Sequence, residues 1–363
     1  MRTAIFALTP EGGLLALRLR DVVTEATLFL PERIQHHIPA ECNAQYFKRL
    51  AEVVNTAFTR YDALVFVMAT GIVVRMIAPH VKSKLYDPAV LVFDEQGQHG
   101  ISLLSGHIGG ANALTQKLCF AIGADPVITT ATDVTGRLAP DAVAAQLALR
   151  PVPKRAIQVL NTALLEGHRI KYLLDMELLH RAFYTSALSR ENISVVPFHD
   201  VPTHSSDGEY RIIITSAACV PQETEIPERT LYLVPRRLIA GVGCRAGIPE
   251  ADILHALAEA CRMIDRDISF IDFLASTEVK SKEAGLLAAA RTLERDICFY
   301  TQDELINMVE KYGLIESNFV KKTIGVGNVS EAAALCAAAG KGGRMALGKT
   351  IFGKVTVALL WEK

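Results

Sequence analysis

A continuous apolar run, Ala63–Ala69, is the feature that most constrains how this chain can fold. It has the length of a β-strand and does not alternate polar with apolar residues, which indicates a strand buried on both faces. Such strands occur in parallel sheets that carry helices on both sides. Thr70 and Gly71 follow the run, as expected where a strand turns into a helix. The sequence therefore predicts an α/β layer around this strand.

Strand-length apolar runs alternate with segments of helical periodicity at both ends of the chain. The N-terminal part predicts strands over 3–8, 26–30, 89–94, 100–104 and 127–130 and helices over 46–58 and 111–122. The C-terminal part predicts strands over 238–242, 268–274, 297–300 and 354–361 and helices over 250–264, 282–293 and 329–339. We expect a multi-domain α/β fold in which mostly parallel sheets are flanked by helices and glycine-rich loops lie at the strand ends.

The middle of the chain is less regular. It predicts a helix over 154–166, strands over 193–198, 211–215 and 231–234, and loops over 204–208 and 221–229. We therefore expect three domains: an N-terminal α/β domain over residues 1–145, a variable middle α/β domain over 146–235, and a C-terminal α/β domain over 236–363.

Composition excludes several classes of protein. A net charge of -1 argues against a globally basic nucleic-acid binder. The seven cysteines never form a Cys-x-x-Cys pair, which argues against a disulfide framework and against a zinc site of the usual spacing. The longest apolar stretch ends at Arg75 and is shorter than the roughly 20 residues that span a bilayer. We expect a cytoplasmic protein that neither enters a membrane nor holds a resident metal.

The segment Ser105–Asn112 places three glycines around one histidine, between a predicted strand and a predicted helix. Glycine lets the backbone approach a ligand closely, and histidine can exchange a proton near neutral pH. We therefore assign His107 a proton-transfer role and expect a substrate to contact Ser105, Gly106, Gly109, Gly110 and Asn112. Upstream, Asp94 and Glu95 are candidates for a base or an orienting partner, and Asp94 is the one we assign. The alternatives are a structural histidine and an Asp94 that caps the hairpin.

Two other glycine-rich segments can be interpreted in two ways each. Gly71 with the basic Arg75 and Lys84 predicts an anion site at a strand-to-helix turn, or else a tight turn beside a solvated basic loop. The segment Gly241–Gly247 is one residue longer than the dinucleotide-binding glycine pattern. Within it, Cys244 beside Arg245 is a candidate nucleophile or a packed thiol at a ligand-binding loop.

A fourth segment, residues 325–349, is glycine-rich and cationic but lacks the spacing of a phosphate-binding P-loop. A solvated hairpin is the alternative interpretation. Acidic residues are absent from 63–86, 96–124 and 332–361, which hold most of the glycine loops. Although the net charge of the whole chain is close to zero, these segments therefore predict local cationic surfaces, which suit a small polyanion rather than nucleic acid.

In combination these motifs resemble the cobalt-precorrin-5A hydrolase (CbiG) family. TGIVVR, LVFDEQGQHGISLLSGHIGGANALTQKL and PVITTATD are similar to its N-terminal domain. IAGVGCRAG, ASTEVKSKEAGL and FVKKTIGVGNVSEAAAL are similar to its C-terminal domain, and RAIQVLNTALLEGHRI lies in the variable middle domain. The resemblance covers nearly the whole chain.

The resemblance implies an enzyme of anaerobic cobalamin biosynthesis. It implies opening of the δ-lactone of cobalt-precorrin-5A and release of acetaldehyde to give cobalt-precorrin-5B. The cobalt enters inside the substrate, so no cofactor is implied. The tetrapyrrole carries several carboxylates, and we expect these to be bound by Arg75, Lys84, Arg245, Lys280, Lys341 and Lys349. We also expect the substrate to contact Gly71, Gly243, Cys244 and Glu283.

Two other functions remain as alternatives. A non-catalytic carrier would bind the tetrapyrrole intermediate without releasing an aldehyde. A nucleotide-dependent oxidoreductase is suggested by the glycine loops, although their spacing is wrong for it. The sequence leaves open transient contact with neighbouring pathway enzymes and a homo-oligomeric state.

Overall fold

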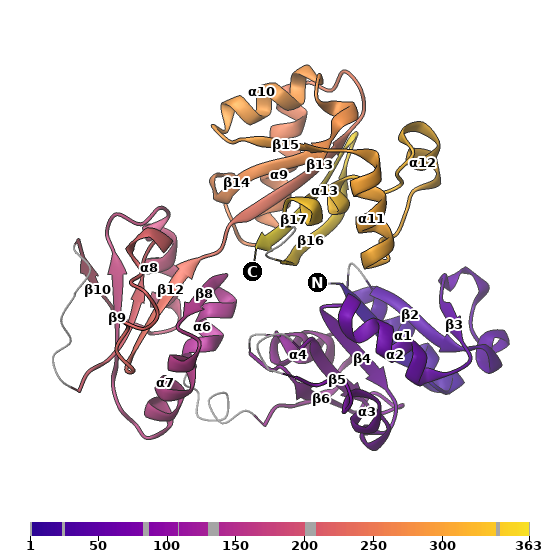
Figure 1. Cartoon of the computed structure of the whole chain (residues 1–363). Helices are drawn as coiled ribbons and strands as arrows, with labels where there is room; N and C mark the ends of the chain where they lie inside the picture. Colours follow the sequence, from indigo (N-terminus) through magenta and orange to yellow (C-terminus); the bar gives the residue numbers. More distant parts are fainter. Residues whose placement is uncertain are drawn as a thin grey trace.

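The computed structural model describes residues 2–23, 26–82, 87–107, 109–129, 138–199, 208–338 and 342–362. Strands and helices alternate along the chain and build three separate sheets, each flanked by helices (Figure 1). The expected α/β, multi-domain fold with mostly parallel sheets is confirmed. No helix among the described residues is long and apolar enough to cross a membrane.

The N-terminal sheet has the strand order β3-β2-β1-β4-β5-β6-β7. Strands β1 to β5 run parallel, whereas β6 is antiparallel to β5 and β7 is parallel to β6. The segment after β6 therefore leaves the sheet at the edge where β1, β4 and β5 begin. The elements are β1 (Thr3–Ala7), α1 (Pro10–Val22), β2 (Ala26–Pro31), β3 (Gln45–Phe47), α2 (Leu50–Arg60), β4 (Ala63–Val67), α3 (Thr70–Ile77), β5 (Ala89–Phe93), β6 (His99–Leu104), α4 (Ala111–Ile122) and β7 (Asp125–Val127).

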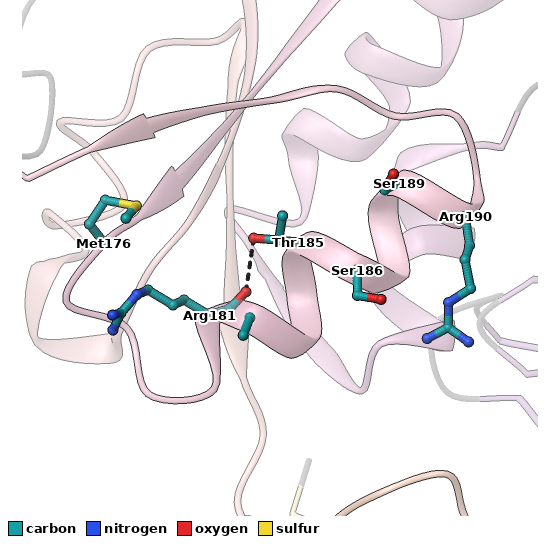
Figure 2. Close-up of a pocket in the computed structure, with 7 residues that line it drawn as sticks. Met176, Arg181, Thr185, Ser186, Ser189 and Arg190 are labelled. Atoms are coloured by element: carbon teal, nitrogen blue, oxygen red, sulfur yellow. Dashed lines mark hydrogen bonds between the residues drawn. The ribbon is translucent and has the colours of Figure 1, made fainter.

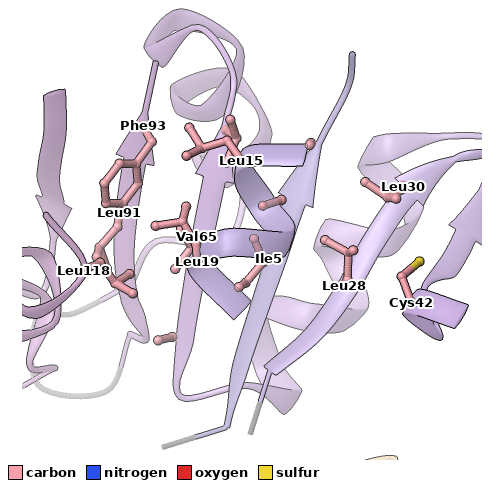
Figure 3. Close-up of a cluster of buried hydrophobic side chains, with 14 of the residues drawn as sticks. Ile5, Leu15, Leu19, Leu28, Leu30, Cys42, Val65, Leu91, Phe93 and Leu118 are labelled. Atoms are coloured by element: carbon pink, nitrogen blue, oxygen red, sulfur yellow. The ribbon is translucent and has the colours of Figure 1, made fainter. Parts of the chain in front are cut away.

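The expected double-sided burial of β4 is confirmed. Val65 packs in a cluster on one face with Ile5, Leu19 and Leu91 (Figure 3), and Phe66 packs in a second cluster on the other face. The helix expected over 46–58 begins later, because residues 45–47 form the edge strand β3. Thr130, at the end of the strand expected over 127–130, lies outside the described residues.

The middle sheet has the order β10-β9-β11-β12-β8, with β8 antiparallel to β12. Its elements are α6 (Pro140–Gln146), β8 (Leu149–Val152), α7 (Arg155–Leu165), β9 (Ile170–Asp175), α8 (Arg181–Arg190), β10 (Val195–Phe198), β11 (Tyr210–Ile214) and β12 (Thr230–Pro235). Val143 and Ala144 of α6 are buried in the core of this sheet. The domain division stays a prediction, and this packing indicates a first boundary before Pro140 rather than at 145.

The C-terminal sheet has the order β15-β14-β13-β17-β16, with β17 antiparallel to both of its neighbours. Its elements are β13 (Leu238–Cys244), α9 (Glu250–Arg262), β14 (Ile271–Thr277), α10 (Ala284–Thr292), β15 (Ile297–Tyr300), α11 (Gln302–Tyr312), α12 (Asn318–Ile324), α13 (Ser330–Ala337), β16 (Gly343–Phe352) and β17 (Val355–Glu362). The glycine-rich cationic segment, residues 325–349, thus ends within β16, which pairs with β17 as a hairpin. For this end of the segment, the structure agrees with the hairpin interpretation. Ala339, at the end of the helix expected over 329–339, is not among the described residues.

Candidate active site

The loop between β6 and α4 is tightly folded and strained. Ser105 has a left-handed backbone with φ 59°, which is unusual for a residue other than glycine. Its buried hydroxyl has no hydrogen-bond partner in the described part of the chain. The amides of Ala111 and Asn112 donate to the carbonyls of Ser105 and Gly106 at 3.2 and 3.0 Å. Strain combined with an unsatisfied buried hydroxyl is typical of functional loops.

The glycines of this loop are required by close contacts. A Cβ at Gly106 would lie 2.6 Å from Oδ1 of Asn112, and one at Gly109 would lie 2.6 Å from the Ser105 carbonyl oxygen. Gly110 has φ 85° and donates its amide to the His107 carbonyl at 3.0 Å. The Gly110 amide is therefore engaged within the loop, and the expected contact of Gly110 with a substrate stays a prediction. The amides of Gly106 and Gly109 donate to no residue that the structure describes.

His107 lies beside a carboxylate from α6, the helix that packs on the middle sheet. Its Nδ1 lies 3.5 Å from Oδ1 of Asp141, and the two side chains are 11% and 3% exposed. Asp141 lies in the first turn of α6 and also accepts a hydrogen bond of 3.2 Å from Nδ2 of Asn161 in α7. A buried carboxylate beside one imidazole nitrogen fixes the orientation of the ring. Sequence reasoning missed Asp141, since no local pattern links the start of α6 to the distant loop.

Asp94 does not meet His107. It lies at the turn before β6, while His107 follows the other end of that strand, about 20 Å away for a six-residue strand. Its carboxylate accepts the amides of Gln96, Gln98 and His99 at 2.9, 3.2 and 2.6 Å. Burial opposes ionisation, but these three amides outweigh it and lower the pKa of Asp94. The geometry therefore matches the hairpin-capping alternative.

We expect the Asp94→Ala variant to lose about 1–2 kcal/mol of folding stability, because three amides lose a charged acceptor. The folded-state pKa of Asp94 is lowered, so its contribution is present above the unfolded pKa near 4 and disappears as the pH falls through the folded pKa. Urea unfolding of both proteins at pH 7 and at pH 3 measures this difference. A difference that persists unchanged at pH 3 would contradict the capping role.

The residues Gly71 and Arg75 lie at the opposite edge of the N-terminal sheet from His107. Both belong to α3, which follows the carboxyl end of β4. Nη1 of Arg75 donates to the Gly71 carbonyl at 2.8 Å, a contact within the helix itself. The structure therefore does not bring these two residues to the His107 loop. Lys84 lies outside the described residues.

In the C-terminal domain, a second group of expected residues lies where β13 ends. Lys280 Nζ lies 3.1 Å from Oε2 of Glu283, and the Gly247 amide donates to Oε1 of Glu283 at 2.7 Å. Burial opposes ionisation of Glu283, but these two donors outweigh it and lower its pKa. Burial raises the pKa of Cys244 despite the nearby Lys280, which favours a packed thiol over a nucleophilic thiolate.

The other expected residues of this domain are engaged in local contacts. The amide of Arg245 donates to the Lys354 carbonyl at 3.1 Å, and its side chain is exposed. A Cβ at Gly243 would lie 2.6 Å from Oγ1 of Thr356. Lys349 Nζ donates to the Gly327 carbonyl at 3.0 Å, and burial lowers its pKa. Lys341 lies outside the described residues, so its expected role stays a prediction.

A shallow hollow on the middle domain lies apart from all of these residues. It is lined by α8 and the preceding segment, with Arg181 and Arg190 at its ends (Figure 2). The Thr185 hydroxyl donates to the Arg181 carbonyl at 3.0 Å, so part of its polar lining is already paired. Among the described residues, no group of three or more His, Cys, Asp or Glu is arranged to hold a metal ion.

Comparison with known proteins places these sites in context. Residues 52–133 match the family described as cobalamin synthesis G N-terminal, and residues 238–360 match that described as cobalamin synthesis G C-terminus. A cobalt-precorrin-5A hydrolase from Salmonella typhimurium is 37% identical over 91% of this chain and 90% of its own length. One from Priestia megaterium is 28% identical over 92% and 88%.

A solved structure with the same fold supports the architecture. A cobalamin biosynthesis protein G homologue from Sulfolobus solfataricus aligns with a TM-score of 0.58 over 100% of this chain and 97% of that one. Its sequence is 19% identical, so this likeness concerns the fold alone.

Proposed function

We propose, since this chain belongs to the cobalt-precorrin-5A hydrolase (CbiG) family, that it opens the δ-lactone of cobalt-precorrin-5A and releases acetaldehyde to give cobalt-precorrin-5B. The observation that carries the assignment of the active site is the buried pair of His107 and Asp141 beside a strained glycine loop. Cobalt is part of the substrate, and the proposal includes neither a resident metal nor a cofactor. Location in the cytoplasm is part of the same proposal.

The first chemical step is hydrolysis of the lactone. His107 takes a proton from water, and the resulting hydroxide attacks the lactone carbonyl carbon. The ring C–O bond then breaks, and His107 gives its proton to the leaving ring oxygen. The products are an alcohol and a carboxylic acid that ionises to solvent, and His107 is neutral again. Asp141 holds the ring of His107 and stabilises its protonated form. The amides of Gly106 and Gly109 are placed to stabilise the developing oxyanion.

The second step releases the two-carbon fragment. The new alcohol loses its proton, the carbon–carbon bond to the macrocycle breaks, and the electron pair of that bond remains on the macrocycle. The fragment leaves as acetaldehyde. The same His107 can accept the alcohol proton, because the lactone oxygen and the new alcohol oxygen are one atom.

The test is release of acetaldehyde from the lactone substrate by the purified protein, followed by coupled reduction of the aldehyde with NADH. We expect continuous turnover, with the aldehyde and the opened tetrapyrrole formed in equal amounts. Binding of the lactone without aldehyde would favour the carrier alternative instead. Stabilisation of the protein against heat by NAD, NADP or a flavin, without aldehyde release, would favour the oxidoreductase.

A further inference from the structure

Three arginines from distant parts of the chain come together near the His107 loop. Arg150 in β8 pairs opposite Val234 in β12. The Arg236 amide, just after β12, donates to the Ala148 carbonyl at 3.0 Å, so Arg236 lies beside the start of the strand that carries Arg150. Nη1 of Arg236 donates to the carbonyl of Glu362 at 3.0 Å. Glu362 pairs across the sheet with Gly343, the residue before Arg344. We refer to Arg150, Arg236 and Arg344 as the arginine cluster.

The arginine cluster adjoins the candidate active site directly. Nη2 of Arg344 lies 3.4 Å from the Gly109 carbonyl, within the loop that carries His107. Asp141, the partner of His107, belongs to α6, which ends just before β8 and Arg150. A ligand held by the arginine cluster would therefore extend to the loop whose free amides and histidine form the proposed catalytic group.

Two members of the arginine cluster, Arg150 and Arg236, carry positive charges that the described residues compensate poorly. Neither Arg150 nor Arg236 forms an ion pair with any residue that the structure describes. Burial, together with repulsion from Arg344 and Arg150, lowers the pKa of Arg236 to about 10. Arg344 differs from these two residues, because Asp62, which pairs with Arg2 at 3.2 Å, also attracts it.

Gathering partly desolvated cations of like charge is unfavourable unless an anion shares the site. Such an arrangement is more typical of a binding site than of a structural contact.

We propose that the arginine cluster binds peripheral carboxylates of the tetrapyrrole and so holds the lactone against the His107 loop. The ligand's identity in this inference rests on the proposed function. Guanidinium groups bind carboxylates through paired N–H donors and are charged at every physiological pH. Three neighbouring guanidinium groups suit a macrocycle that carries several acetate and propionate groups. Arg150, Arg236 and Arg344 thereby take the carboxylate-binding role that we expected, from the sequence, for other lysines and arginines.

The test measures binding of uroporphyrin, which carries an acetate and a propionate on each pyrrole and has no lactone. We expect Arg236→Gln to weaken uroporphyrin binding by about 10- to 100-fold, the loss typical of a charged hydrogen bond. Coproporphyrin, in which methyl groups replace the acetates, should bind wild type more weakly and respond less to the substitution. The same variant should raise KM for acetaldehyde release by about tenfold.

Stability provides a second readout. Without ligand, Arg236→Gln should melt at the same or a higher temperature than wild type, since it removes a buried charge that its neighbours repel. Arg150→Gln should repeat both effects, and it serves if Arg236→Gln does not fold. The matched control is Arg237→Gln, because the Arg237 guanidinium lies 4.7 Å from the Phe273 ring and is absent from the cluster. Its uroporphyrin affinity should equal that of wild type.

The outcomes separate this inference from the proposed function. Normal acetaldehyde release with unchanged KM and unchanged uroporphyrin affinity in both cluster variants would overturn the inference and leave the hydrolase intact. Weakened binding in both variants of a protein that releases no aldehyde would support a carboxylate site and overturn the hydrolase. Equal loss of affinity in Arg237→Gln would also overturn the inference, because the effect would then reflect general surface charge.

Discussion

Replacing His107 by alanine is expected to lower kcat for acetaldehyde release by about 10²- to 10⁴-fold, the usual contribution of a positioned general base. Its imidazole is nearly buried, and the carboxylate of Asp141 lies beside Nδ1, so the ring is held in a defined orientation within the loop. Removing the ring leaves the loop backbone and the arginine cluster in place. Substrate affinity should therefore change far less than turnover. Single-turnover kinetics with the lactone, alongside equilibrium binding of uroporphyrin, measures the two effects separately.

His99→Ala is the matched control for this experiment. His99 lies at the start of β6, the strand whose other end leads to His107, and it is exposed. It should retain wild-type turnover. Asp141→Asn should retain binding but lower kcat and alter its pH profile, since the amide cannot stabilise an imidazolium. Wild-type kcat in His107→Ala would remove this residue from the chemistry, and an unchanged pH profile in Asp141→Asn would leave Asp141 a merely structural neighbour.

A feature of the fold could be predicted from the sequence where residues close together in the chain determine it. The strand β4 was predictable because its residues are apolar without interruption, and both of its faces are covered. Helix α1 was not predicted, because Pro10 and the pair Gly12-Gly13 suggest a turn. In the structure Thr9 caps this helix by accepting the Gly12 amide at 3.1 Å, and proline is tolerated in a first helical turn.

The candidate site shows the same limit. The loop around His107 was predictable because its glycines and its histidine are neighbours in the sequence. Its partner Asp141 was not, since it lies in helix α6, which packs on a different sheet from the one that carries the His107 loop. The arginine cluster draws on β8, the link after β12, and β16, so each arginine alone looks like an ordinary surface charge. Contacts between residues of different domains leave no periodic signal in the sequence.

The third glycine motif can now be explained largely by packing. Gly241 lies in the middle of β13, between β14 and β17, and α13 crosses directly over it. A Cβ at this position would overlap the carbonyl oxygen of Ser330 and lie 2.9 Å from its carbonyl carbon. The Cβ of Ala334 in α13 would lie 3.0 Å from the added Cβ, and Ala332, Ala333 and Ala334 are all fully buried. Small residues of this kind are what such a close approach of a helix to a sheet needs. Glycine at 241 therefore sets the distance between helix and sheet.

We expect Gly241→Ala to destabilise the C-terminal domain by about 3 kcal/mol or more, because α13 can relieve the overlap only by moving its backbone off a packed sheet. Trp361, the single tryptophan, lies in β17 of the same sheet, so its fluorescence during urea unfolding follows this domain directly. Gly71→Ala is the control: its Cβ would approach only the flexible end of Arg75 at 3.3 Å, within a helix. Far-UV circular dichroism during urea unfolding reports the helices of every domain, and by this measure that variant should unfold like wild type or be up to about 1 kcal/mol more stable. Equal stability of Gly241→Ala and wild type would mean that the motif is kept for ligand binding rather than for helix packing.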